Sequence, residues 1–418
     1  MTLPAPARRS LLRAAAGLSA GAGALAATSV PAHAHPGRRG KPWSPRVLQS
    51  GQGPVRGLYV PSTPENVLWG RLPNRDTEPV AVVSSGDVVT LDTVSHEGIL
   101  EDQGQDPRAY FSGFGVAATD VLDDAAAIAA TVPHDGPGPH VVNRPVAVTG
   151  AEPGDVLKVE VLDLALRVPY GVVSNRHGRG SLPGEYPEAW AGDPSLAEWF
   201  NPGGNVSVFT AVEARGGSLV GAMPGPVPAR FPLGPFLGLM GVARDTSALV
   251  DSVPPTDAGG NLDIKDLTVG STLYLPVRVP GAMFSVGDPH MAQGHGEVAL
   301  TAMEGSLRAT LRLSVVRPGD GAPAGTADYP FAETPEHWIP LGLSDPDGPV
   351  DGQETDLDEA MRTAVRQAVR FLTEDLGMPG PLAYTYLSAA ADFHVSQVVD
   401  RTTGVHATIR KADFDGLR

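Results

Sequence analysis

One short stretch of the chain concentrates side chains that can bind a cation or move a proton. Asp288 and His290 are two residues apart, so an extended backbone directs both side chains to the same side, and Pro289 favours that extended conformation for Asp288. His295 and Glu297 repeat the offset, and the neighbouring glycines allow the backbone to approach a ligand closely. These donors suit Zn²⁺ or a similar cation, or an acid–base pair; a hydrogen-bonded polar turn is the alternative.

Three segments upstream carry further candidates. His96 lies in a Ser-His-Glu-Gly sequence, where it is either a ligand or a surface histidine beside acidic neighbours. Asp263 follows a Gly-Gly-Asn sequence that permits close backbone approach, and it is either a ligand or the cap of a turn. The proline-stiffened loop from His134 to His140 could line a pocket, although loops of this composition are common. None of these segments identifies a site by itself.

The composition limits the chemistry that the chain can perform. Cysteine is absent, which excludes thiol nucleophiles, thiolate zinc sites and disulfides, so any metal must be held by His, Asp, Glu or backbone oxygens. Asp and Glu number 47 against 31 Lys and Arg, which gives a net charge of −16. An acidic chain repels phosphate backbones, and the sequence has no basic stripe with interleaved aromatic residues. We therefore expect no nucleic-acid partner.

The elements that must position these side chains are mainly strands. The 50 Gly and 41 Pro interrupt helices, while apolar residues make up 42% of the chain and can form a core. Apolar and polar residues alternate at 157–161 and at 307–315, which is the period of a half-buried strand with a solvent-facing side. The segment 304–306, Glu-Gly-Ser, predicts a hairpin that joins the second of these strands to the strand before it.

Two helices are expected near the C-terminus. Asp356 and Glu359 form a capping-box-like start, apolar residues then recur at helical spacing, and Gly377 ends the helix. A second helix is expected at about 382–391, after a Pro-Gly-Pro sequence. The predicted fold class is therefore mainly β with a C-terminal α-helical pair (α+β).

The first 34 residues predict an export signal. The adjacent Arg8 and Arg9 precede a mildly apolar Ala/Gly stretch, and 32–34, Ala-His-Ala, offers small residues to a signal peptidase. The paired arginines resemble a twin-arginine signal, which carries folded proteins across the bacterial membrane. We expect a mature protein in the periplasm or outside the cell, without a membrane segment. A basic N-terminus before a linker is the alternative.

Several motifs occur in a fixed order along the chain: Gly259-Gly260-Asn261-Leu262-Asp263, 270–277, 280–288, His290 and 294–297, with support from 150–157, 235–243, 358–362 and 387–400. Together they resemble the acetamidase/formamidase family, over about residues 85–404. The resemblance implies a mainly β fold of sandwich or barrel type. It also implies hydrolysis of the C–N bond of a small linear amide to a carboxylate and ammonia, with a bound divalent metal.

The resemblance implies a site made of Asp263, Asp288, His290 and Glu297. We expect Asp263, Asp288 and His290, with His96 as an additional ligand, to hold the metal, with Zn²⁺ as the first expectation and Ca²⁺ as the alternative. Glu297 is the expected acid–base group, which takes the proton of water and passes it to the leaving nitrogen. Asp288 and His295 are expected to join it in catalysis.

Further expectations concern the oxyanion and two departures from the family pattern. Backbone N–H groups around Gly259 and Gly260 are expected to donate to the oxyanion. His295 stands where members often have Asp, and Ala258 where many have His. These departures could alter the metal, the substrate or the activity.

Two other functions stay open. One is hydrolysis of a larger or cyclic amide on the same scaffold, with Trp190, Trp199 and Trp338 lining a wider pocket. The other is a binding protein without catalytic activity, in which a metal only holds loops together.

We divide the chain into the signal (1–34), an N-terminal extension with the first strands (35–84), the amidase core (85–317) and a C-terminal segment (318–418) that completes the same unit. The sequence does not decide between a monomer and a homodimer.

Overall fold

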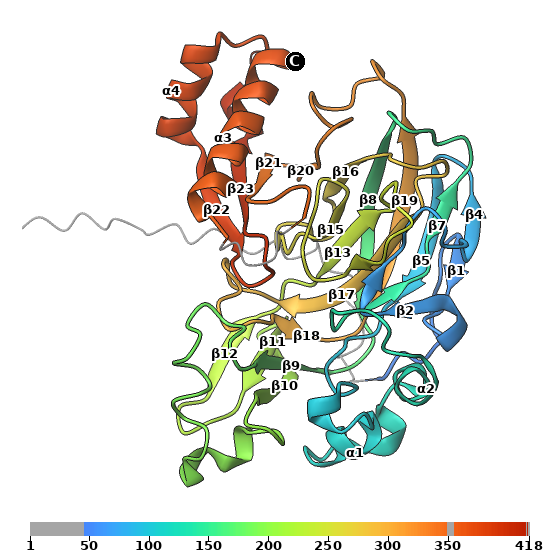
Figure 1. Cartoon of the computed structure of the whole chain (residues 1–418), viewed down its shortest axis with the longest axis vertical. Coiled ribbons are helices and arrows are strands. Elements are labelled where there is room, and N and C mark those ends of the chain that lie inside the picture. Colours follow the sequence, from blue (N-terminus) through green and yellow to red (C-terminus); the bar gives the residue numbers. More distant parts are fainter. Residues whose placement is uncertain (1–45, 349–354, 415, 417–418) are drawn as a thin grey trace, which may run out of the picture. The chain divides into compact units, whose positions relative to one another are not determined.

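Strands form most of the regular structure in the computed structural model, which describes residues 46–348, 355–414 and 416 (Figure 1). The alternating segments predicted as strands lie in a nine-stranded sheet. Its order is β1 (Leu58–Val60), β5 (Asp87–Asp92), β19 (Leu307–Val316), β8 (Val156–Leu166), β16 (Thr272–Pro276), β20 (Phe331–Glu333), β21 (His337–Leu343), β23 (Gly404–Arg410) and β22 (Asp392–Gln397).

A twelve-stranded sheet carries most of the candidate residues. Its main path is β12 (Ala229–Pro232), β11 (Ser218–Met223), β10 (Val206–Arg215), β9 (Tyr170–Asn175), β18 (Met303–Glu304), β17 (Phe284–Ala292), β13 (Phe236–Val242) and β15 (Gly259–Asn261). Four strands pair beside this path: β2 (Val67–Trp69), β4 (Ala81–Val83), β6 (Val141–Asn143) and β7 (Val146–Val148). β3 (Arg71–Leu72) and β14 (Val250–Asp251) form a separate pair.

The two large sheets share one hydrophobic core. The largest core cluster takes Leu91, Val159 and Leu311 from the nine-stranded sheet and Met240 and Phe284 from the twelve-stranded sheet, all of them buried. β13 and β17 therefore pack against this shared core, and close packing restricts the conformations of the side chains on them.

Helices cover two other parts of this unit. α1 (Pro107–Ser112) and α2 (Asp123–Thr131) pack on a second core cluster with β9 and β10. α3 (Leu357–Glu374) and α4 (Gly380–Ala390) lie beside each other next to β23, with a third cluster beneath them (Figure 1). Short 3₁₀ turns occupy Pro64–Asn66, Glu101–Gln103, Ala118–Asp120, Pro194–Trp199 and Lys411–Phe414.

The C-terminal helical pair confirms the predicted fold class. The Asp356 side chain accepts hydrogen bonds from the backbone N–H groups of Asp358 (2.9 Å) and Glu359 (3.2 Å), so it caps α3. The Glu359 carboxylate instead pairs with arginines on the helix, so the reciprocal half of a capping box is not formed. α3 ends three residues before Gly377, which is left-handed at φ 68°.

The predicted hairpin at 304–306 is wrong. β18 ends at Glu304 and belongs to the twelve-stranded sheet, whereas β19 pairs with β5 and β8 in the other sheet. The turn therefore carries the chain from one sheet to the other. Local turn chemistry is the same in both cases, so sequence alone does not distinguish them.

One face of β19 also differs from its prediction as solvent-facing. Arg308 is buried, and its guanidinium pairs with Asp92 at 2.6 Å and 2.9 Å. Polar residues therefore still alternate with apolar residues along β19, but at Arg308 the polar side chain contacts a buried partner and not solvent.

All described residues fall in one compact unit, Trp43–Arg418. The export signal lies outside the described residues, and the internal boundaries at 84/85 and 317/318 stay predictions. Among the described residues no helix is both long and apolar enough to cross a membrane.

Candidate active site

The candidate site is built on β17, between β13 and β18. Asp288 and His290 both lie on β17, and Gly287 and His290 are paired with Leu239 and Phe236 of β13. The expected extended conformation of Asp288 is wrong, because its φ is +49°. A short polar side chain tolerates this left-handed region, and the carboxylate of Asp288 lies beside His290, with 2.8 Å between Oδ2 and Nε2.

Three candidate carboxylates share this unusual backbone. Asp263, Asp288 and Glu297 have φ values of 51°, 49° and 47°. A non-glycine residue in this region costs on the order of 1–3 kcal/mol and tends to occur at functional sites. The fold thus accepts strain at each of the three positions from which a carboxylate enters the site.

His290 is the centre of the site. Its Nε2 lies 2.8 Å from Asp288 Oδ2 and 3.0 Å from Glu304 Oε1, and its Nδ1 lies 3.0 Å from Gln293 Oε1 and 3.7 Å from Asp263 Oδ1. Gln293 also donates to the backbone oxygen of Asp263 at 3.0 Å, which fixes this side of the ring.

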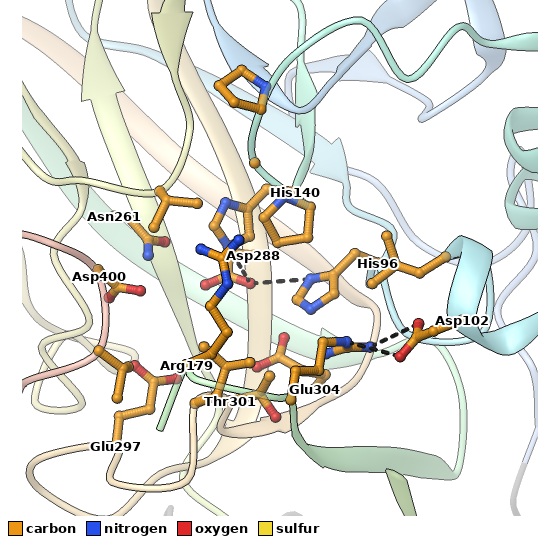
Figure 2. Close-up of a pocket in the computed structure, with 18 of the residues that line it drawn as sticks. His96, Asp102, His140, Arg179, Asn261, Asp288, Glu297, Thr301, Glu304 and Asp400 are labelled. Carbon is orange, nitrogen blue, oxygen red and sulfur yellow. Dashed lines mark hydrogen bonds and ion pairs between the residues drawn. The ribbon is translucent and has the colours of Figure 1, made fainter. Parts of the chain in front are cut away.

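A second pair of imidazoles faces the other oxygen of Asp288. His96 Nδ1 and His140 Nε2 lie 3.6 Å and 3.7 Å from Asp288 Oδ1 (Figure 2). The opposite nitrogen of His140 contacts Ser252 Oγ at 3.0 Å, which leaves Nε2 directed toward the site. We call this whole group the carboxylate–histidine cluster: His96, His140, Asp263, Asp288, His290, Glu297 and Glu304.

The donor set fits a divalent cation. Members of the cluster form three overlapping groups whose ligand atoms lie within 4.8 Å of one another: His96/His140/Asp288, Asp263/His290/Glu297 and Asp288/His290/Glu304. Several of these buried atoms have no hydrogen-bond partner within the described chain, including both oxygens of Asp263, Asp288 Oδ1 and Glu304 Oε2. Buried polar atoms are normally paired, so these unpaired oxygens point to an absent positive partner.

The electrostatics of the cluster agree with that fit. Burial raises the pKa of Asp263 and of Glu297 well above their ordinary values, and it raises the pKa of Glu304 to about 7. Burial also acts on Asp288, but His290 and His140 outweigh it and hold its pKa below the ordinary value. Carboxylates crowded in a dry site ionise together only if a cation compensates them.

Two features leave space at the cluster. A cavity of about 350 Å³ opens on it, lined by His96, His140, Asp288, Glu297 and Glu304 among others (Figure 2). At Gly238 on β13, an added Cβ would lie 2.5 Å from Asp263 Oδ1 and 2.7 Å from Asp288 Oδ2. Glycine at this position therefore keeps the two carboxylates free of a steric neighbour.

The structure brings together His96, Asp263, Asp288, His290 and Glu297, as expected from the sequence. It does not bring His295 to them. The same-side rule for His295 and Glu297 holds only for extended backbone, and Gly296 (φ 96°) and Glu297 turn the chain between them.

His295 instead meets other histidines. Its ring stacks on His394 at 4.5 Å between centroids and lies 5.4 Å from the ring of His406. Burial, together with Lys265, lowers the pKa of His295 to about 4.

Sequence reasoning missed His140 and Glu304 as members of the cluster. His140 lay in the loop recognised as a candidate pocket wall, and that loop does line the cavity. Glu304 was assigned to a hairpin turn, and only the sheet change at that turn directs it inward. Asp400, whose pKa burial raises to about 7, also lines the cavity; in the sequence it is only the last residue of the supporting motif at 387–400.

The expected oxyanion donors are not all available. The backbone N–H of Gly259 donates to Thr256 O at 3.0 Å, so it is already engaged. Asn261, the next residue but one, is buried and lines the cavity (Figure 2). Its side-chain oxygen has no hydrogen-bond partner in the described chain, so the amide is free to orient toward a ligand.

The tryptophans do not widen this cavity. Trp190 and Trp199 line a separate groove together with Tyr186 and Phe200. Trp338 packs on Phe371 of α3, with 5.0 Å between ring centroids, in the C-terminal core. Ala258, the other departure from the family pattern, is buried in the main core.

Comparisons with known proteins agree with the motifs. The formamidase of Methylophilus methylotrophus is 29% identical over 62% of this chain and 73% of its own length. The acetamidase of Mycolicibacterium smegmatis is 31% identical over 38% of this chain and 49% of its own length, so the match spans about half of that relative.

Solved structures share the fold. The acetamidase of Bacillus halodurans superposes with a TM-score of 0.62 at 24% identity, covering 86% of this chain and 99% of its own. The acetamidase of Yersinia enterocolitica gives a TM-score of 0.62 at 23% identity, covering 88% and 95%. The sequence pattern of the Acetamidase/Formamidase family matches residues 240–411, the part that holds the end of β13 and all of β15, β17 and β18. Over these residues the chain is similar to the acetamidase/formamidase family.

Proposed function

We propose that this protein hydrolyses the C–N bond of small linear amides, releasing a carboxylate and ammonia. The observation that carries the proposal is the buried carboxylate–histidine cluster, with its unpaired oxygens, opening on a cavity of about 350 Å³. The names of the relatives, formamidase and acetamidase, support a small amide as substrate.

The chemical problem is that an amide is a poor electrophile with a poor leaving group. Its hydrolysis needs an activated water, a stabilised oxyanion and a proton for the departing nitrogen. A divalent cation, with Zn²⁺ as our first choice, would supply Lewis-acid polarisation and acidify a water molecule at neutral pH. Asp263, Asp288 and His290, with His96, His140 and Glu304 around them, are the residues that would hold it.

Glu297 is the proposed proton carrier. It is buried, it lines the cavity, and burial raises its pKa, so its carboxyl holds a proton more readily than an exposed glutamate does. It takes a proton from water during attack and returns it to nitrogen as the C–N bond breaks.

Asn261 is the proposed oxyanion donor. Its side-chain amide lies in the cavity wall, and an N–H directed at the carbonyl oxygen would stabilise the charge that develops there. It takes over the role that the engaged N–H of Gly259 cannot perform.

Charged residues in and behind the cavity wall contact His96 but take no part in the proposed reaction. Arg176 pairs with Glu97 at 2.9 Å and with Asp102 at 3.1 Å, and Glu97 in turn lies 3.5 Å from His96 Nε2. Arg176 thus anchors the Glu97 carboxylate beside His96, on the side of the ring opposite Asp288.

The test is ammonia release from formamide, acetamide and propionamide by the purified protein and by Glu297→Gln. We expect release from at least one of these amides, with Glu297→Gln lowering kcat by roughly 100- to 10,000-fold while bound metal stays unchanged. Glu185→Gln, at an exposed carboxylate, is the control and should behave as wild type.

Two results would contradict the proposal. Full activity in Glu297→Gln would remove the proton carrier. No ammonia from any of the three amides, with metal bound, would favour a larger amide or a binding protein.

A further inference from the structure

Four residues outside the carboxylate–histidine cluster form a second group of potential metal ligands. We call it the histidine cluster: Asp266, His295, His394 and His406. The ligand atoms of Asp266, His295 and His406 lie within 4.8 Å of one another. The four residues come from separate segments, namely the loop between β15 and β16, the loop after β17, and the strands β22 and β23.

The three imidazole rings are in contact. His394 and His406 face each other across β22 and β23 as register partners, with 5.3 Å between ring centroids. His295 completes the group by stacking on His394 at 4.5 Å. Imidazoles gathered in this way are the ligands that Zn²⁺, Cu²⁺ and Ni²⁺ prefer.

His406 is oriented as a metal ligand would be. It is fully buried, and its Nδ1 contacts Ser396 Oγ at 2.8 Å, while its Nε2 lies 3.1 Å from Asp266 Oδ2. A second hydrogen bond on the far nitrogen fixes the ring and the tautomer of a ligating histidine. With Nδ1 as the donor, Nε2 presents a lone pair toward a carboxylate, an arrangement that a cation between them would stabilise.

The loop that carries His295 is held against β22 by its backbone. The N–H of Gly296 donates to Ser396 O at 3.1 Å, and Val398 N–H donates to Gly296 O at 3.2 Å. His295 therefore stands at a defined position beside His394 although it is solvent-exposed. A cluster with one buried, one half-buried and one exposed imidazole also gives an ion a path from solvent.

We propose that Asp266, His295, His394 and His406 form a second site, which binds a divalent transition-metal ion of the Zn²⁺, Cu²⁺ and Ni²⁺ class. No residue of this site belongs to the carboxylate–histidine cluster. His295, which departs from the family pattern, supplies the ligand that completes it. The bound ion holds the loop at 293–297 against β22, and Glu297 lies at the end of that loop.

The experiment is equilibrium dialysis of the full chain against Zn²⁺ after chelation, with metal content measured per protein. We expect wild type to bind one more ion per chain than His295→Gln or His394→Gln. His337→Gln, at a histidine on β21 outside both clusters, should match wild type. Both test positions are at least partly exposed, so their replacement leaves the core intact.

A second variant separates the two metal sites. Asp288→Asn should lose metal from the carboxylate–histidine cluster and keep the ion that His295→Gln loses. Ser396→Ala should weaken the second site by roughly 10- to 100-fold, because the ring of His406 loses its anchor.

The overturning results are equally definite. Equal stoichiometry and Kd in wild type, His295→Gln and His394→Gln would show that the histidine cluster is only a stacked and hydrogen-bonded group. An unchanged Kd in Ser396→Ala would remove His406 as a ligand.

Discussion

Two groups of buried charges in this protein are built in opposite ways. The first, which we call the arginine cluster, consists of Asp92, Asp124, Arg167 and Arg308. Arg167 Nη2 lies 2.8 Å from Asp124 Oδ2, and Arg308 makes two bonds to Asp92. The other nitrogens of Arg167 donate to Leu48 O, Ser62 Oγ and Thr93 O.

The carboxylate–histidine cluster is equally buried but incompletely paired. Its acidic groups outnumber its imidazoles, and several of its oxygens have no partner within the described chain. The arginine cluster pairs its charges with protein groups, whereas the carboxylate–histidine cluster leaves several buried oxygens that a ligand could pair. In our proposal, this difference separates a structural group from a functional one.

Asp288→Asn should have the largest effect on function. The side chain keeps its size but loses the charge that faces His96, His140 and His290, so metal content should fall and ammonia release should drop on the order of 1,000-fold. Metal analysis and an ammonia assay on the same sample check this, with Asp163→Asn, exposed on β8, as the control. Retained turnover in Asp288→Asn would remove the cluster from catalysis.

Arg167→Met should have the largest effect on stability. It leaves Asp124 buried without its cation, which costs about 3–5 kcal/mol of the free energy of unfolding. Urea unfolding measures the loss, and Arg215→Met, exposed at the end of β10, serves as the matched substitution. Turnover per folded molecule should not change. A loss of less than about 1 kcal/mol in the free energy of unfolding would mean that the arginine cluster contributes no more than a surface salt bridge.

Gly238→Ala should affect the site alone. Its Cβ would press on the carboxylates of Asp263 and Asp288, and a displacement of about 1 Å costs roughly 100-fold in rate. Gly234→Ala is the control, since a Cβ there meets nothing within 4 Å. Equal activity in the two variants would show that the carboxylates do not need the space at Gly238.

The pH dependence of stability needs no substitution, and it should appear only after chelation. Burial raises the pKa of Glu304 and of Asp400 to about 7, so the folded state retains protons that the unfolded state releases near pH 4. Stability is therefore fully present below about pH 4 and declines as the pH rises through 7. Urea unfolding from pH 5 to 8 measures the slope.

Two comparisons test the cause of that slope. Added Zn²⁺ should reduce it, and Asp400→Asn should make it shallower in the chelated protein, because Glu304 alone of the two then titrates. A slope that Asp400→Asn leaves unchanged would assign the effect to other groups.

The fold class and five of the seven residues of the carboxylate–histidine cluster could be predicted from the sequence. Period-two alternation identified β8 and β19, and helical spacing with Asp356 as cap identified α3, because both signals are local. Asp288 and His290 were recognisable because they belong to a single strand. His140 and Glu304 come close to them only because β17 pairs with β6 and β18. This strand pairing cannot be predicted from local sequence patterns.

Two errors have the same origin. The hairpin at 304–306 and the shared side of His295 and Glu297 were both extrapolated from regular local geometry. The chain instead changes sheet at the first position and turns through Gly296 at the second. Irregular backbone conformations of this kind are common at functional sites, and they cannot be predicted from the alternation of apolar and polar residues.

The central claim, that the incompletely paired cluster is the site of amide hydrolysis, is tested most directly by ammonia release from formamide and acetamide before chelation, after chelation and after Zn²⁺ is added back. Metal content is measured at each stage. We predict that release stops when the metal is removed and returns when the metal is restored. Undiminished release from fully metal-free protein, or none from fully loaded protein, would contradict the account.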